Sequence, residues 1–163
     1  MFLAICAHES KLALTEAGWL SENAVREWCK QYEPGTDRGK RLGNTKDGDG
    51  YLFRGAGYIQ LSGRANYESF ASDVRINDPL VVTRGANYVA DNYAWETACW
   101  FWNSNGISNK IRNDIAGGVD KERVFLQASN AVYRGNYSSS NTSDGEFKWN
   151  NRLSLYRQIA ETL

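Results

Sequence analysis

The sequence predicts a mainly α-helical fold with a small β element, built as one domain. Apolar residues recur at three- and four-residue spacing in several segments, which is typical of helices with one buried face. β-forming residues mixed with glycines occur in only one short stretch, residues 51–61. The length of 163 residues is enough for one domain with its own hydrophobic core.

The N-terminal half predicts two helices, a loop and a hairpin. Residues 1–10 are apolar until H-E-S and indicate a buried helix. Ser21 is a good N-cap for a second helix, which must stop before Pro34. Residues 34–50 are rich in turn-forming types and predict a long loop. Residues 51–61, Y-L-F-R-G-A-G-Y-I-Q-L, predict a short β-hairpin.

Helical signals dominate the rest of the chain. We expect helices over residues 64–74, 84–103, 120–133 and 149–162. The last of these carries a clear apolar stripe at Leu153, Tyr156, Ile159 and Leu163. A low-complexity stretch of polar residues, N-Y-S-S-S-N-T-S-D-G, separates the final two helices and predicts a loop.

Charge and cysteine content exclude several classes of function. Nineteen acidic residues balance nineteen basic ones, so the chain lacks the basic field that nucleic-acid binding needs. No apolar run approaches the ~20 residues of a membrane span. The three cysteines are far apart and include no C-x-x-C pair, which argues against a disulfide framework or a zinc site. We expect buried thiols and folding in a reducing cytoplasm.

Carboxylates are the best candidates for chemistry. His8 is the only histidine, and no G-x-S-x-G nucleophile motif accompanies it. Hydrolysis of a glycosidic bond needs a protonated acid at the leaving oxygen and a second group that activates water or attacks. Glu9 ends an apolar segment, where desolvation would raise its pKa and keep a proton available. On these grounds alone, an ordinary glutamate at a helix end remains the alternative.

Six segments are spread in order over nearly the whole chain: A-H-E-S at 7–10, G-D-G at 48–50, a long run within 53–67, D-P-L at 78–80, A-C-W-F-W at 98–102 and N-R-L-S-L-Y at 151–156. The most specific is the long run, R-G-A-G-Y-I-Q-L-S-G-R-A-N-Y, because so long a run is not expected by chance. Together these segments resemble glycoside hydrolase family 19, which holds plant-type chitinases and many phage endolysins.

The resemblance implies a lysozyme-like, two-lobed α-helical domain spanning residues 1–163, with the hairpin beside a substrate groove. It assigns Glu9 as the general acid, Ser62 to the attacking water and Arg152 to the catalytic carboxylates. It also implies an inverting reaction, in which a second carboxylate acts as base across a gap of roughly 6.5–9.5 Å. Substrate contacts are assigned to His8, Tyr58, Gln60, Asn66 and Asn130.

The general base has two candidates. Relatives of the endolysin type read H-E-S-G-G-F-x-Y-T-E-E, with the base in the final T-E-E. This chain reads H-E-S-K-L-A-L-T-E-A, which is one residue shorter and has one glutamate there. Glu16 is the predicted base and Glu22 is the alternative.

Two polymers suit this resemblance, the peptidoglycan glycan strand and chitin. The sequence of the long run is closer to that of the phage and bacterial branch than to the plant G-R-G-P-I-Q-L-S-W-N-Y-N-Y, so we expect a muramidase-type endolysin. A chitinase, a sugar-binding module without catalysis and a structural or virion protein remain alternatives. We expect no cofactor or metal, no nucleic-acid partner, no stable membrane association and a monomer. An endolysin would accumulate in the host cytoplasm and then act on the cell wall.

Overall fold

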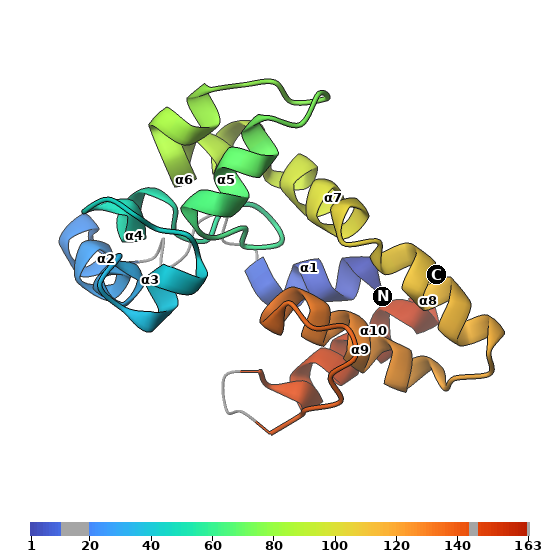
Figure 1. Cartoon of the computed structure of the whole chain (residues 1–163). Helices are drawn as coiled ribbons and strands as arrows, with labels where there is room; N and C mark the ends of the chain where they lie inside the picture. The colour runs from blue at the N-terminus through green and yellow to red at the C-terminus, as the bar shows by residue number, and fades with distance from the viewer. Residues whose placement is uncertain (11–19, 144–146, 163) are drawn as a thin grey trace. The chain divides into compact units, whose positions relative to one another are not determined.

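The computed structural model describes residues 1–10, 20–143 and 147–162 (Figure 1). These residues form ten α-helices and one 3-10 helix, with no β-strand in the parts described. The prediction of a mainly α fold is confirmed. None of the described helices is both long enough and apolar enough to span a bilayer.

The chain divides into two compact units. The first unit contains Met1–Glu9 and Phe101–Leu163, and the second contains Ser10–Trp100. The first unit therefore joins the N-terminal helix to the C-terminal third of the sequence. Each unit has its own packing.

The first unit packs helices around α9. Its helices are α1 (Phe2–Ser10), the end of α7 (Ala94–Ser104), α8 (Ile107–Ala116), α9 (Lys121–Arg134) and α10 (Trp149–Thr162). Asp120 starts α9, because its carboxylate accepts hydrogen bonds from the main-chain NH groups of Glu122 and Arg123. The expected helices over 1–10, 120–133 and 149–162 are confirmed.

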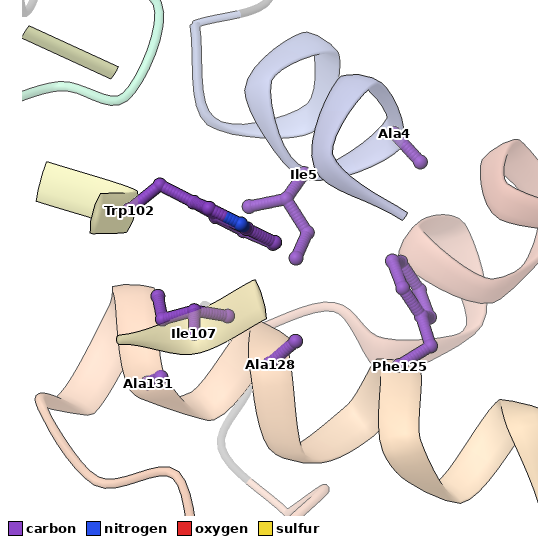
Figure 2. Packing of buried hydrophobic residues seen from close by; sticks show 7 residues of the cluster. All are labelled: Ala4, Ile5, Trp102, Ile107, Phe125, Ala128 and Ala131. Atoms are coloured by element: carbon purple, nitrogen blue, oxygen red, sulfur yellow. The ribbon is translucent and has the colours of Figure 1, made fainter. Parts of the chain in front are cut away.

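The core of this unit brings together both ends of the sequence. Figure 2 shows Ala4 and Ile5 of α1 above the α9 helix, with the Trp102 ring of α7 directed toward Ile5. α9 contributes small residues and one ring to this core, and α8 contributes its first residue: Phe125, Ala128, Ala131 and Ile107. None of the seven residues is more than 7% exposed, so the position of α1 is fixed by close packing.

The second unit consists mainly of short helices. They are α2 (Glu22–Cys29), a 3-10 turn (Lys30–Tyr32), α3 (Asp37–Arg41), α4 (Asp49–Leu52), α5 (Arg64–Ala71), α6 (Leu80–Asn92) and the start of α7. The Ser21 hydroxyl accepts a hydrogen bond from the Ala24 NH at 3.4 Å, which confirms the predicted N-cap. The α5 prediction is also confirmed, three residues shorter than expected.

The single helix expected over 84–103 is wrong. α6 ends at Asn92, α7 begins at Ala94, and Tyr93 between them is non-helical at φ −138° and ψ 28°. α6 itself is kinked at Gly85, which has φ 65°. A Cβ at this glycine would lie 2.2 Å from the Leu52 carbonyl oxygen. The kink therefore belongs to a close approach of α6 to α4 that a side chain would prevent.

The hairpin expected over 51–61 is also wrong. Its first residues belong to α4, and one isolated antiparallel bridge joins Ala56 to Leu61. The two residues exchange main-chain hydrogen bonds of 3.1 and 2.9 Å. Between them the chain turns tightly, with Gly57 at φ 70° and Gln60 at φ 55°. Because α4 ends at Leu52 and α5 begins at Arg64, few residues remain on either side of this bridge to form strands.

Two further predictions need correction. The loop expected over 34–50 contains α3 and the start of α4, and the Thr36 hydroxyl caps α3 by accepting from the Gly39 NH at 2.9 Å. α8 was not predicted. Cys6 and Cys29 are buried as expected, whereas Cys99 is exposed.

Candidate active site

Glu9 lies in the last turn of α1, and its side chain is 14% exposed. The residues before it on the helix, Ala4, Ile5 and Cys6, are almost fully buried. The apolar N-terminal segment thus forms a core helix that carries a carboxyl group with it into a poorly hydrated position. The sequence placed Glu9 at the end of such a segment, and the structure agrees.

Arg152 of α10 contacts the Glu9 carboxylate directly. Its Nη1 donates a hydrogen bond to Glu9 Oε1 at 2.7 Å, and its Nε donates to the Phe147 carbonyl at 2.7 Å. The Arg152 side chain is 1% exposed. A cation so deeply buried needs a negative partner, so the pair joins the two ends of the sequence inside the first unit.

Two opposing effects act on the Glu9 carboxyl. Burial raises its pKa, because the charged form loses hydration. The charge of Arg152 and its hydrogen bond lower the pKa, but by less, so that the net shift is upward. A carboxyl with a raised pKa retains a proton nearer to neutral pH, which is what a general acid requires.

Asn130, on α9, is fully buried in the same unit. Its Nδ2 donates to three carbonyls, those of Leu126 at 3.1 Å and of Ser139 and Asn141 at 3.2 Å each. Its Oδ1 accepts from Arg134 Nε at 2.8 Å. The side chain therefore links residues 139–141 to α9 by hydrogen bonds. In this arrangement its amide atoms are already bonded and present no polar atom to a ligand. The predicted sugar contact of Asn130 would require these residues to move.

His8 precedes Glu9 on α1 and is partly exposed. It is the only histidine of the chain. Its assignment as a substrate contact stays a prediction.

Three polar residues assigned to the substrate or to the attacking water lie together in the second unit. Ser62 Oγ donates to the Gln60 carbonyl at 2.9 Å, and Asn66 Nδ2 donates to the Ser62 carbonyl at 2.8 Å. Gln60 Nε2 donates to the Gly57 carbonyl at 3.1 Å. All three side chains are partly exposed. The turn after α4 and the first turn of α5 thus carry a polar cluster, Gln60, Ser62 and Asn66, within reach of solvent.

Tyr58 lies beside this polar cluster and against α7. Its NH donates to the Ala94 carbonyl at 3.0 Å, and its ring lies 4.2 Å from that of Trp95. Trp95 is 46% exposed, so the pair offers aromatic surface next to polar groups. Such surface suits contact with sugar rings. Trp95 was not among the residues predicted from the sequence, although the tryptophan-rich segment 95–102 was a usable signal.

The G-D-G segment has a structural role. Asp49 is 2% exposed and forms a two-point ion pair with Arg64, at 2.5 and 2.8 Å. Asp49 Oδ2 also accepts from the NH groups of Thr45 and Lys46. Burial would raise the pKa of Asp49, but these hydrogen bonds and the Arg64 charge together lower it. Asp49 therefore stays ionised and fixes the start of α5, from which Asn66 projects.

Of the two candidates for the general base, only Glu22 lies in the part of the chain that the structure describes. Glu16 lies outside it. Glu22 is the first residue of α2, where its carboxylate pairs with Arg26 at 2.7 Å. Both of these side chains are more than half exposed, as in a hydrated i,i+4 pair on a helix surface.

Potential metal ligands do not gather in the described residues. There, no group of three or more His, Cys, Asp or Glu side chains is arranged to hold an ion. The arrangement instead offers a buried acid with its cation in one unit and a polar cluster with an aromatic pair in the other.

Comparison with known proteins supports the resemblance seen in the sequence. No model of a known protein family matches the chain. The chain is 29% identical over 151 residues to a glycosyl hydrolase family 19 domain-containing protein of Haemophilus influenzae, and the match covers 74% of this chain and 70% of the relative. This similarity supports a glycosidase of family 19.

Proposed function

We propose that the chain is an endolysin that hydrolyses the β-1,4 bonds between N-acetylmuramic acid and N-acetylglucosamine in peptidoglycan. The observation that carries the proposal is the buried Glu9 carboxyl, which has a raised pKa and an Arg152 guanidinium 2.7 Å away. Such a carboxyl can donate a proton at a pH where exposed carboxyls have lost theirs. The similarity to a family 19 protein supports the same class of reaction.

The proposed reaction inverts the anomeric carbon. Glu9 transfers its proton to the glycosidic oxygen as the bond from that oxygen to the anomeric carbon breaks. A water attacks the opposite face, and the base, Glu16 in this proposal, takes the proton that the water loses. Arg152 stabilises the Glu9 carboxylate that the first transfer leaves. Ser62 is proposed to orient the water, and Tyr58, Gln60 and Asn66 are proposed to contact the glycan.

Glu9→Gln tests the acid, because it removes the proton and leaves the side-chain volume nearly unchanged. We expect turnover to be lost while the fold is retained, measured as product release from purified peptidoglycan together with circular dichroism. Undiminished turnover in a folded Glu9→Gln protein would refute the assignment.

Parallel Glu16→Gln and Glu22→Gln variants test the base. We expect Glu16→Gln to lose at least about 100-fold in rate and Glu22→Gln to lose little, because loss of a general base typically costs two to four orders of magnitude. The reverse pattern would make Glu22 the base. If neither variant is impaired, both assignments are wrong.

Peptidoglycan is preferred to chitin because of the sequence. The run R-G-A-G-Y-I-Q-L-S-G-R-A-N-Y is closer to the phage and bacterial branch of the family than to the plant branch. On this proposal the protein accumulates in the host cytoplasm and reaches the wall at lysis. It would act as a monomer.

The substrate is identified by mass spectrometry of the products. Purified peptidoglycan and colloidal chitin are digested in parallel, reduced with borohydride and analysed, with Glu9→Gln as the control. Muropeptides that end in reduced N-acetylmuramic acid would support the muramidase. Chito-oligomers without muropeptides would make the protein a chitinase.

A sugar-binding module is the second candidate function. It is favoured by one observation, the single glutamate in the segment where relatives of the endolysin type carry two. This candidate predicts glycan binding without cleavage, and binding that Glu9→Gln leaves unchanged. Pull-down of insoluble peptidoglycan beside the digest would distinguish it from the enzyme.

A further inference from the structure

Two aromatic rings of the first unit lie against the Arg152 guanidinium. The Arg152 Cζ lies 4.5 Å from the centre of the Phe147 ring and 5.6 Å from the centre of the Tyr133 ring. The two rings are 5.4 Å apart. Phe147 is fully buried, so its contact with the cation is shielded from water, where such contacts are strongest.

Phe147 holds Arg152 through its main chain as well as its ring. The Phe147 carbonyl accepts from Arg152 Nε at 2.7 Å, whereas the Nη1 of the same guanidinium donates to Glu9. The guanidinium is planar and its donors are fixed in that plane. A carbonyl at one edge and a ring near the guanidinium together determine which way Nη1 points.

The Phe147 ring is itself held in place. It lies nearly parallel to the Trp149 ring of α10, with an interplanar angle of 7° and 6.3 Å between centres. A second cation, Arg134 of α9, lies 5.3 Å from the centre of the Phe147 ring and 5.2 Å from that of Tyr133. Arg134 also donates to the buried Asn130. Both α9 and α10 therefore fix the aromatic pair Phe147–Tyr133.

We propose that Phe147, with Tyr133 beside it, is a positioning residue that holds the Arg152 guanidinium in the orientation that pairs with Glu9. In this role Phe147 acts on the Glu9 carboxyl through Arg152. The structural part concerns the Glu9–Arg152 pair alone. Its consequence for catalysis rests on the proposed function, in which Glu9 is the acid.

Charged and titratable groups near the acid and the aromatic pair come from α1, α9 and α10 and from the residue before α10. Arg152 of α10 is the group that acts on the Glu9 carboxyl, and His8 precedes Glu9 on α1. Arg134 of α9 contacts the aromatic pair, and Lys148 follows Phe147 in sequence. If Arg152 is held less firmly, its charge and its hydrogen bond stabilise the Glu9 carboxylate less, whereas the carboxyl stays buried. The pKa of Glu9 should therefore rise further when the aromatic pair is removed.

The test is a ¹³C NMR titration of the glutamate carboxyls in the full chain, with the Glu9 signal assigned by its loss in Glu9→Gln. In Phe147→Leu we expect the Glu9 pKa to rise by roughly 0.5–1 unit, part of the 1–3 units that an adjacent cation typically supplies. Tyr133→Leu should raise the Glu9 pKa by less. Tyr133→Phe, which keeps the ring, should leave the Glu9 pKa at the value of the unchanged protein.

Phe125→Leu is the matched control. Phe125 is fully buried in the same unit, where its ring stacks on Tyr156 at 4.4 Å and lies 5.7 Å from Trp149, the ring that also packs on Phe147. Its replacement removes the same volume beside the same tryptophan but leaves the Phe147 and Tyr133 rings on Arg152, so the Glu9 titration should stay unchanged. Equal titrations in Phe147→Leu and Phe125→Leu, or no shift in either Phe147→Leu or Tyr133→Leu, would overturn the inference. If Phe147→Leu does not fold, comparison of Tyr133→Leu with Tyr133→Phe tests the positioning role instead.

The titration needs no substrate, so the inference and the proposed function can fail separately. A shift in Phe147→Leu with no glycan cleavage by the unchanged protein would support the positioning role and refute the enzyme. In an active enzyme, the alkaline limb of the pH–rate profile should move upward in Phe147→Leu and stay in place in Phe125→Leu. Cleavage whose alkaline limb is the same in all variants would count against the inference.

Discussion

At the scale of single residues, Glu9 and Asp49 are opposite solutions to the burial of a carboxyl group. Glu9 has one strong partner, Arg152, and burial dominates its pKa. Asp49 has a two-point contact from Arg64 and two main-chain donors, and these dominate instead. One carboxyl is thus suited to holding a proton and the other to remaining a charged anchor.

The raised pKa of Glu9 has a consequence for stability. The folded state binds this proton more tightly than the unfolded state, so the contribution of Glu9 is fully present below its ordinary pKa of about 4.3 and is lost as pH rises through the raised value. We expect the free energy of unfolding of the unchanged protein, relative to Glu9→Gln, to fall between pH 5 and pH 8. Urea unfolding at both pH values measures this, and a constant difference would contradict a raised pKa.

Asp49 should show the opposite dependence. Its pKa is lowered in the folded state, so its contribution is present above the ordinary value of about 3.9 and is lost as pH falls through the lowered value. Asp49→Asn should cost about 3 kcal/mol at pH 7, the low end for a broken buried pair, because Arg64 retains Glu68 at 3.1 Å. In urea unfolding the loss should shrink below about pH 4. A loss of the same size at pH 3 would contradict this account.

At the scale of elements, the polar cluster depends on how closely one turn approaches a helix. Gly57 has φ 70°, and a Cβ there would lie 2.3 Å from Thr97 Oγ1 and 2.9 Å from the Ala94 carbonyl oxygen. Both atoms belong to the first turn of α7. The turn that presents Tyr58, Gln60 and Ser62 therefore has its position only while residue 57 lacks a side chain.

Gly57→Ala should displace this turn and destabilise the second unit. Gly118→Ala is the matched control, because Gly118 also has positive φ, at 80°, but nothing lies within 4 Å of its Cβ position. The free energy of unfolding should fall by about 1 kcal/mol in Gly118→Ala, from the strained backbone conformation alone. In Gly57→Ala it should fall by at least about 2 kcal/mol. Urea unfolding of both variants measures the difference. Equal losses would mean that contact with α7 does not constrain the turn.

At the scale of the whole molecule, charge balance limits how the chain would approach the anionic cell wall that is its target in the proposed function. Its formal net charge is zero at pH 7. Long-range attraction to a charged polymer requires a net field, and salt screens that attraction within ~10 Å at 0.1 M. We therefore expect recognition to come from contacts made at short range.

This charge balance predicts weak salt dependence of the proposed activity. The rate of product release from purified peptidoglycan should change by no more than about threefold between 20 and 200 mM NaCl, because there is little net attraction to screen. Borohydride-reduced products quantified at several salt concentrations measure it. A tenfold fall over this range would indicate a charged surface that the balanced total conceals.

Local patterns determined much of the fold of this protein. The apolar run of residues 1–7, the Ser21 cap and the stripe of 149–162 each predict a helix that the structure contains, because capping and amphipathic spacing are properties of neighbouring residues. The sequence also marked Glu9 as a carboxyl at the end of an apolar segment. The order of the motifs supplied the family resemblance.

Only the tertiary structure decided where helices approach each other closely and which polar side chains are buried and hydrogen-bonded. The kink at Gly85 accompanies a close approach of α6 to α4, which the residues within α6 do not encode by themselves. The burial of Asn130 and the aromatic pair on Arg152 join residues distant in sequence. Sequence spacing records periodicity along one element, whereas the partner of a buried charge is set by packing between elements.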